Sequence, residues 1–150
     1  TDGIHAVDTL RWLCDGEVES VAGDSRRLDA EHWNMHLALV RFSSGATGVL
    51  LVNFMAGRRI FSVEIHAPGV TFFGDPEEGG KLYADSQLDP VETLDPFAMA
   101  DSDQPHRAFG PWEMTAHFLD AVRRKRPMET CFDDALKTME LVDAVYGEQI

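Results

Sequence analysis

Residues 1–13, TDGIHAVDTLRWL, encode an amphipathic helix at the start of the chain. Asp2 suits the N-cap position, where its carboxylate accepts hydrogen bonds from backbone N–H groups of the first turn. Apolar residues recur at the spacing of one helix face, which we expect to be buried. They are Ile4, Val7, Leu10 and Leu13. His5 is therefore predicted to project from the first turn of a helix that packs on the core.

His5 is the first candidate functional residue. The positive end of the helix dipole disfavours a second positive charge there, so we expect a neutral imidazole, which can both donate and accept a proton. The alternative is a structural histidine, hydrogen-bonded near the helix start, which is the commoner role for a lone histidine. Asp8 and Arg11, three residues apart, are predicted to form a surface ion pair that stabilises the helix slightly.

Length, charge and cysteine content exclude several classes of protein. A chain of 150 residues is expected to be one domain with a core that needs neither disulfides nor a metal. Cys14 and Cys131, each at the end of an apolar helix pattern, are predicted to be reduced and partly buried thiols of a cytoplasmic protein. No apolar run reaches the roughly 18–20 residues that cross a membrane. The net charge of −13 argues against nucleic-acid binding, because it would repel phosphates.

The middle of the chain has the pattern of an antiparallel sheet. Alternating and continuous apolar runs separated by turn residues predict a series of short strands. We expect them near residues 18–23, 35–42, 47–55, 61–66, 70–73 and 81–84. The sequence Ser43-Ser44-Gly45 predicts a hairpin turn between the second and the third of these strands. Residues 86–110 are acidic and rich in proline, without a sustained period, and are predicted to be a long loop.

Two helices are predicted to close the chain. The first begins at Gly110-Pro111 and ends at Arg126-Pro127, and the second begins at Thr130, with Asp133 three residues later in an arrangement like a capping box. Each helix carries an apolar stripe that we expect to lie in the core. The stripes are Met114, Phe118 and Val122 in the first helix, and Leu136, Met139, Val142 and Tyr146 in the second.

This order of elements predicts an α+β fold, with a mostly antiparallel open sheet and helices on one of its faces. Residues 37–42 and 49–55 have apolar side chains at odd-numbered and at even-numbered positions, which point to opposite faces of a strand. Both faces of the sheet should therefore be covered. The simplest cover for the second face is a second copy of the chain, and we expect a homo-oligomer that associates through this face.

Other chemical motifs are weak or missing. The sequence contains no Gly-x-Gly-x-x-Gly, so the chain is expected to have no nucleotide site of its own. His32 and His36 have the spacing of two metal ligands on a helix, which leaves a metal-dependent hydrolase as an alternative function. The pair falls at the start of a predicted strand and lacks an evident third ligand, so we expect no metal.

Two segments of the chain resemble a known family. Residues 2–13, followed by Val18-Glu19-Ser20-Val21, resemble the start of the C-terminal domain of the Gfo/Idh/MocA oxidoreductases, and residues 130–146 are similar to the closing helix of that domain. The resemblance implies an NAD(P)-dependent dehydrogenase or reductase that acts on a sugar, polyol or related hydroxy compound. It also implies that a separate N-terminal Rossmann domain binds NAD or NADP, while the present domain supplies the substrate pocket and an open sheet for dimerisation.

The family motif is commonly Asp-x-Gly-x-His, in which the Asp and His help to move a hydroxyl proton. Gly3 and His5 match this motif, whereas Thr1 stands where the Asp would be and Asp2 lies one position later. The resemblance therefore implies His5 as the proton-handling residue, with Asp2 either a helper or only a helix cap. Because the chain begins at Thr1, we expect it to be the C-terminal part of a longer enzyme and to be inactive alone. The rival expectation is a binding or oligomerisation module of the same fold without catalytic activity.

Overall fold

The computed structural model describes residues 3–147, which form two compact units. The first unit contains the chain before residue 59 together with the chain from residue 129 onward. The second unit contains residues 59–128. The first unit carries the candidate site, and each unit is described by itself below.

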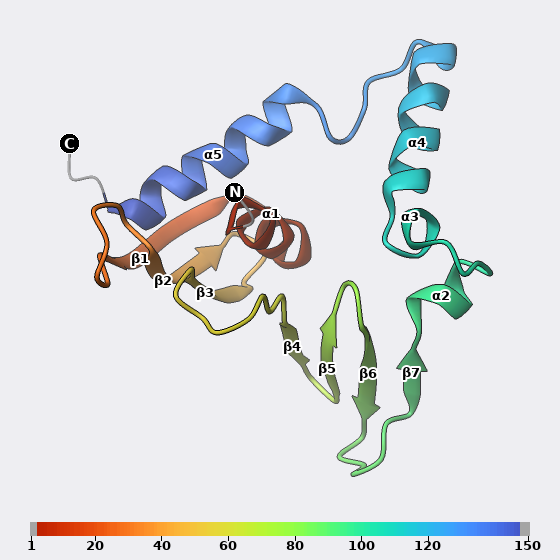
Figure 1. Ribbon diagram of the computed structural model, residues 1–150, viewed down its shortest axis with the longest axis horizontal. Coiled ribbons are helices and arrows are strands. Elements are labelled where there is room, and N and C mark those ends of the chain that lie inside the picture. Colours follow the sequence, from red (N-terminus) through yellow and green to blue (C-terminus); the bar gives the residue numbers. More distant parts are fainter. Residues whose placement is uncertain (1–2, 148–150) are drawn as a thin grey trace. The chain divides into compact units, whose positions relative to one another are not determined.

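Helices and strands follow one another in the predicted α+β order (Figure 1). The elements are α1 (Gly3–Cys14), β1 (Val18–Arg26), β2 (Met35–Phe42), β3 (Thr47–Asn53), β4 (Val63–Ala67), β5 (Val70–Asp75), β6 (Gly79–Ala84), β7 (Glu92–Leu94), α2 (Pro96–Met99), α3 (Pro105–Ala108), α4 (Pro111–Arg124) and α5 (Phe132–Tyr146). The fold class predicted from the sequence is confirmed: antiparallel sheets combine with helices. None of the described helices is long and apolar enough to cross a bilayer.

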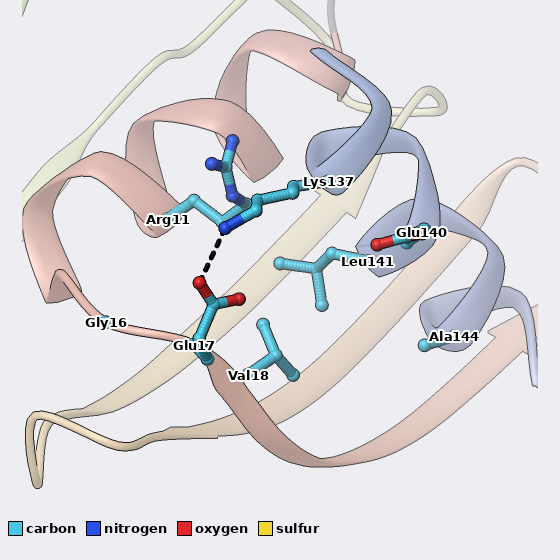
Figure 2. Close-up of a pocket in the computed structure, with 8 residues that line it drawn as sticks. All are labelled: Arg11, Gly16, Glu17, Val18, Lys137, Glu140, Leu141 and Ala144. Carbon is cyan, nitrogen blue, oxygen red and sulfur yellow. Dashed lines mark hydrogen bonds and ion pairs between the residues drawn. The ribbon is translucent and has the colours of Figure 1, made fainter. Parts of the chain in front are cut away.

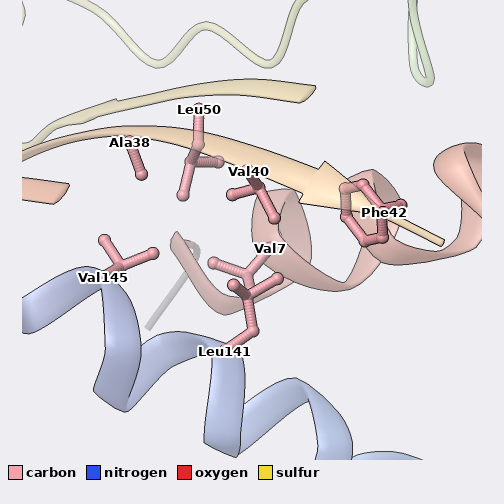
Figure 3. Packing of buried hydrophobic residues seen from close by; sticks show 7 residues of the cluster. All are labelled: Val7, Ala38, Val40, Phe42, Leu50, Leu141 and Val145. Atoms are coloured by element: carbon pink, nitrogen blue, oxygen red, sulfur yellow. The ribbon is translucent and has the colours of Figure 1, made fainter. Parts of the chain in front are cut away.

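The first unit is built on the antiparallel sheet β1–β2–β3. The predicted hairpin joins β2 to β3, and Gly45 adopts a φ of +88° there, which few other residues tolerate. Helices α1 and α5 cover one face of the sheet: α1 packs on β3, and α5 packs on β1 and β2 (Figure 1). Side chains from the sheet and both helices meet in a single buried cluster (Figure 3). The cluster is Val7, Ala38, Val40, Phe42, Leu50, Leu141 and Val145.

The opposite face of this sheet is apolar and is covered by neither α1 nor α5. Burial alternates along β2, so that every second side chain points away from α1 and α5. The register pairs Leu37 with Leu51 and Leu39 with Val49 across β2 and β3. Val49 is 68% exposed and Leu51 is 63% exposed. We call Leu37, Leu39, Val49 and Leu51 the open face. The sequence predicts an apolar face here, because β2 and β3 have apolar residues at both odd-numbered and even-numbered positions.

The second unit contains the antiparallel meander β4–β5–β6–β7 and the helices α2, α3 and α4. The expected loop at residues 86–110 is wrong in part, because β7, α2 and α3 lie within it. Asp95 caps α2 by accepting hydrogen bonds from the N–H groups of Phe97 and Ala98. Pro96 and Pro105 begin the two short helices, where a missing N–H costs nothing. Helices of a single turn are too short to produce a periodic sequence pattern.

The predicted apolar stripes of the last two helices are wrong as core positions, except at Val142, which packs against the buried cluster. In α4 the stripe of Met114, Phe118 and Val122 is exposed, and Ala121 is the buried residue of the helix. In α5 the buried residues are Thr138, Leu141 and Val145, whereas three members of the predicted stripe are exposed and Val142 is half-buried. Helical spacing shows which residues share a face, but it does not show which face is covered.

Two local predictions near the helix ends also need correction. Helix α5 has Cys131 at its N-cap with no hydrogen bond from the side chain, so Thr130 does not form a capping box. Cys131 is exposed rather than partly buried. Cys14 is half-buried, as predicted, and burial raises the pKa of its thiol.

Gly23 allows the C-terminal end of α5 to lie against β1. A Cβ atom at this position would be 2.5 Å from the carbonyl oxygen of Val145, which belongs to the backbone and cannot rotate away. We expect Gly23→Ala to lower the free energy of unfolding by about 1–3 kcal/mol through overpacking. Urea denaturation measures this change. Gly57→Ala is the matched control, because a Cβ at Gly57 meets nothing within 4 Å; equal stability of the two variants would contradict the close approach.

Candidate functional site

Helix α1 holds the candidate catalytic residue on a well-anchored element. Val7 is buried between the sheet and α5, while Ala6 and Leu10 pack beside it. Gly3 brings the first turn close to β3, because a Cβ there would lie 3.1 Å from Cγ1 of Val52. The N-terminal turn of α1 therefore has a defined position on the sheet.

His5 lies on the exposed side of that first turn, as predicted. No hydrogen bond joins its side chain to any of residues 3–147. Asp2 and Thr1 lie outside the described residues. The structure thus presents one imidazole at the surface of a rigid helix, able to accept or donate a proton.

The pair formed by Asp8 and Arg11 is part of a larger network than the sequence predicted. Nη1 of Arg11 lies 3.3 Å from Asp8, as the spacing suggested. Its Nη2 also lies 2.6 Å from Oδ1 of Asp134, and Nη1 donates to Oγ1 of Thr138 over 2.6 Å. Thr138 in turn donates to Asp8 over 2.6 Å. The Arg11 network thus joins α1 to α5.

Loss of the Arg11 network should weaken the packing of α1 on α5. We expect Arg11→Met to lower the free energy of unfolding by about 1–3 kcal/mol, because the mostly buried Thr138 hydroxyl and Asp134 lose a charged partner. The shift of the urea midpoint measures the effect. Arg124→Met is the control: Arg124 pairs with Asp120 on the surface of one helix and is 72% exposed, so its loss should cost under about 0.5 kcal/mol. Similar shifts for both variants would show that the network is no more than a surface ion pair.

His32 and His36 do not form the two-histidine helical site considered from the sequence. His32 is exposed in the loop before β2, whereas His36 is a buried residue of β2. No group of three or more His, Cys, Asp or Glu side chains among residues 3–147 is arranged to hold a metal ion. Nδ1 of His36 is instead 2.8 Å from Oγ of Ser25. The metal-dependent hydrolase therefore has no geometric support from these two histidines.

Two hollows occur in the first unit. One, of about 230 Å³, lies beside the junction of α1, β1 and α5, where Lys137 pairs with Glu17 (Figure 2). The other, of about 200 Å³, is lined by the first turns of α1, by β2 and β3 and by the C-terminal half of α5. His5 lines neither of the two.

The fold of the chain occurs in several solved structures. A dehydrogenase (MviM) from Clostridium difficile matches with a TM-score of 0.80 and 16% identity over 97% of this chain and 46% of its own. An aldose–aldose oxidoreductase from Caulobacter crescentus, complexed with glycerol, matches with a TM-score of 0.76 and 18% identity over 97% of this chain and 43% of its own. The WlbA dehydrogenase from Bordetella pertussis, in complex with NADH and UDP-GlcNAcA, matches with a TM-score of 0.57 and 22% identity over 98% of this chain and 40% of its own.

These similarities establish a shared fold, and the chain spans less than half the length of each of the three proteins. No curated protein sequence matches the chain significantly. A family model described as the GFO/IDH/MocA C-terminal domain matches residues 2–78, a stretch that contains α1, the open-face strands and His5. This match confirms the resemblance predicted from the sequence. The chain belongs to the GFO/IDH/MocA C-terminal domain family.

Proposed function

We propose that the chain is the C-terminal, substrate-side and dimerisation domain of an NAD(P)-dependent oxidoreductase. Its substrate would be a sugar, a polyol or a related hydroxy compound. The observation that carries the proposal is the position of His5, an exposed imidazole on the first turn of α1. The resemblance to the family implies that this residue is the histidine of the Asp-x-Gly-x-His motif. Structural relatives are dehydrogenases and oxidoreductases, one of them complexed with glycerol and another with NADH and UDP-GlcNAcA.

Nucleotide binding is assigned to a part of the protein outside this chain. The chain has no Gly-x-Gly-x-x-Gly, and its net charge of −13 is unfavourable for holding a pyrophosphate. Under this proposal residues 1–150 alone neither bind NAD(P) nor turn over substrate. The nicotinamide supplies the hydride acceptor or donor when it is bound.

His5 is proposed to handle the proton of the reacting hydroxyl. A carbinol carbon releases hydride readily only if the hydroxyl proton also leaves, so a base within hydrogen-bond reach of the oxygen lowers the barrier. In the oxidation direction a ring nitrogen of His5 accepts that proton, and in the reduction direction it returns it to the carbonyl oxygen. Asp2 is assigned as a helper that hydrogen-bonds in this relay, with helix capping as its alternative role.

The open face is proposed to be the dimerisation surface. Leu37, Leu39, Val49 and Leu51 form a contiguous apolar area on β2 and β3, which is costly to leave in water. A second copy presents the same apolar face, so the contact is self-complementary under a two-fold axis. The resemblance to the family also implies an open sheet that is used for dimerisation.

Turnover by the intact protein tests the proposed activity. We expect it to bind NAD or NADP, measured by calorimetry, and to form reduced nicotinamide with at least one member of a panel of aldoses, polyols and nucleotide sugars. A protein that binds neither nucleotide and oxidises or reduces no member of the panel would instead be the non-catalytic module with the same fold.

A further inference from the structure

The smaller hollow of the first unit has the features of a binding site for an uncharged ligand. Its volume is about 200 Å³, and it is lined mainly by apolar side chains from α1, β3 and α5. Among residues 3–147, its lining includes no Arg, Lys, Asp or Glu. A cavity of about 150 Å³ with apolar walls is large enough to take up benzene. The size and the lining therefore suit one small ring.

His36 is the buried polar residue of this lining; Tyr146 also lines the hollow and carries a hydroxyl group, but it is 40% exposed. His36 is 5% exposed, and its ring lies 4.6 Å from the ring of Tyr146 and 6.4 Å from that of Phe54, measured between centroids. Both rings meet the imidazole at steep angles, close to edge-to-face, and hold its plane in one orientation. Burial also lowers the pKa of His36, which favours the neutral imidazole.

The contacts of Ser25 favour the tautomer of His36 in which Nδ1 carries the proton. Oγ of Ser25 donates to the carbonyl oxygen of Val145 over 3.2 Å. A hydroxyl has a single proton, so toward His36 the same oxygen must accept. Nδ1–H of His36 therefore donates to Ser25 over 2.8 Å, and Nε2 carries a lone pair.

Nε2 of His36 is buried and has no hydrogen-bond partner among residues 3–147. Buried acceptors without partners are uncommon in native proteins, because an unpaired acceptor destabilises the folded state. A hydrogen bond from a donor would remove that destabilisation. One buried acceptor without a partner, among mainly apolar described residues, favours a ligand that brings one donor to it. A sugar, which carries several hydroxyl groups, would leave most of them unpaired in the same space.

We propose that this hollow, the His36 cavity, binds a small uncharged molecule with an apolar ring and a single hydroxyl group, of the phenol or cyclic-alcohol class. The hydroxyl donates to Nε2 of His36, and the ring lies among the apolar side chains of α1, β3 and α5. Because His5 does not line this cavity, the proposal does not depend on the oxidoreductase activity.

Binding of p-cresol and toluene to the intact protein tests the proposal. The two molecules match in shape, but only p-cresol has a hydroxyl donor. We expect p-cresol to bind about tenfold more tightly than toluene, measured by calorimetry or ligand-observed NMR. In His36→Phe this preference should disappear. His66→Phe should keep it, because His66 is an exposed residue of β4 outside the cavity.

A second measurement needs no variant. Addition of p-cresol to the wild-type protein should shift the ¹⁵N resonance of Nε2 of His36, while toluene should leave it nearly unchanged. The proposal is overturned if neither molecule binds, if both bind equally to the wild type, or if His36→Phe retains the preference for p-cresol.

Discussion

Leu51→Arg is expected to abolish the dimerisation that we propose for the open face of the intact protein. Leu51 lies on the open face and is 63% exposed, so the substitution does not disturb the core of the first unit. In a two-fold contact the new charge would occur twice and would be buried without a partner. We expect the dissociation constant to rise at least about 100-fold. Sedimentation velocity over a range of concentrations measures it.

Leu88→Arg is the matched control for this experiment. Leu88 is also an exposed leucine, at 96%, but it belongs to the second unit and is not a residue of β2 or β3. The control should associate like the wild type. A wild-type protein that is monomeric at all concentrations, or a Leu51→Arg variant that still dimerises with unchanged affinity, would contradict the assignment of the open face.

The sheet of the first unit could be predicted because its signals are local. Residues 35–42 and 47–53 are apolar runs on either side of a short turn with Gly45, and this arrangement favours a hairpin. The open face could also be anticipated, because these strands have apolar side chains on both of their faces. Both conclusions need only the alternation of side chains along a strand.

The buried face of α5 could not be predicted in the same way. The helix carries two candidate apolar stripes, and the one that is buried includes Thr138, a polar residue. Burial of Thr138 is tolerated because its hydroxyl accepts from Arg11 and donates to Asp8, both on α1. These partners lie 127 and 130 residues away in the sequence. No periodicity within α5 carries that information.

The candidate site was predictable only in part. The position of His5 on the first turn follows from the helix pattern of residues 1–13, and its exposure is confirmed. His36 appeared in the sequence only as a weak metal-ligand pair with His32. Its burial depends on packing by Tyr146 and Phe54, and its tautomer on the contact between Ser25 and the end of α5. These are long-range contacts that the local sequence does not encode.

His5→Asn is expected to lower kcat of the intact protein by about 10²–10⁴-fold, because the variant has no base for the hydroxyl proton. Asparagine keeps a polar side chain at this exposed position, so the fold and substrate binding should persist and KM should change little. His32→Asn is the control, since His32 is also an exposed histidine of the first unit and lies in the loop before β2. It should retain the wild-type kcat.

The most direct test of the proposed role of this domain is therefore the steady-state rate of NAD(P)-linked oxidation of the best substrate, compared between the wild type, His5→Asn and His32→Asn. The account predicts a fall of at least about 100-fold in kcat for His5→Asn alone. A His5→Asn enzyme whose kcat equals that of the wild type would contradict it.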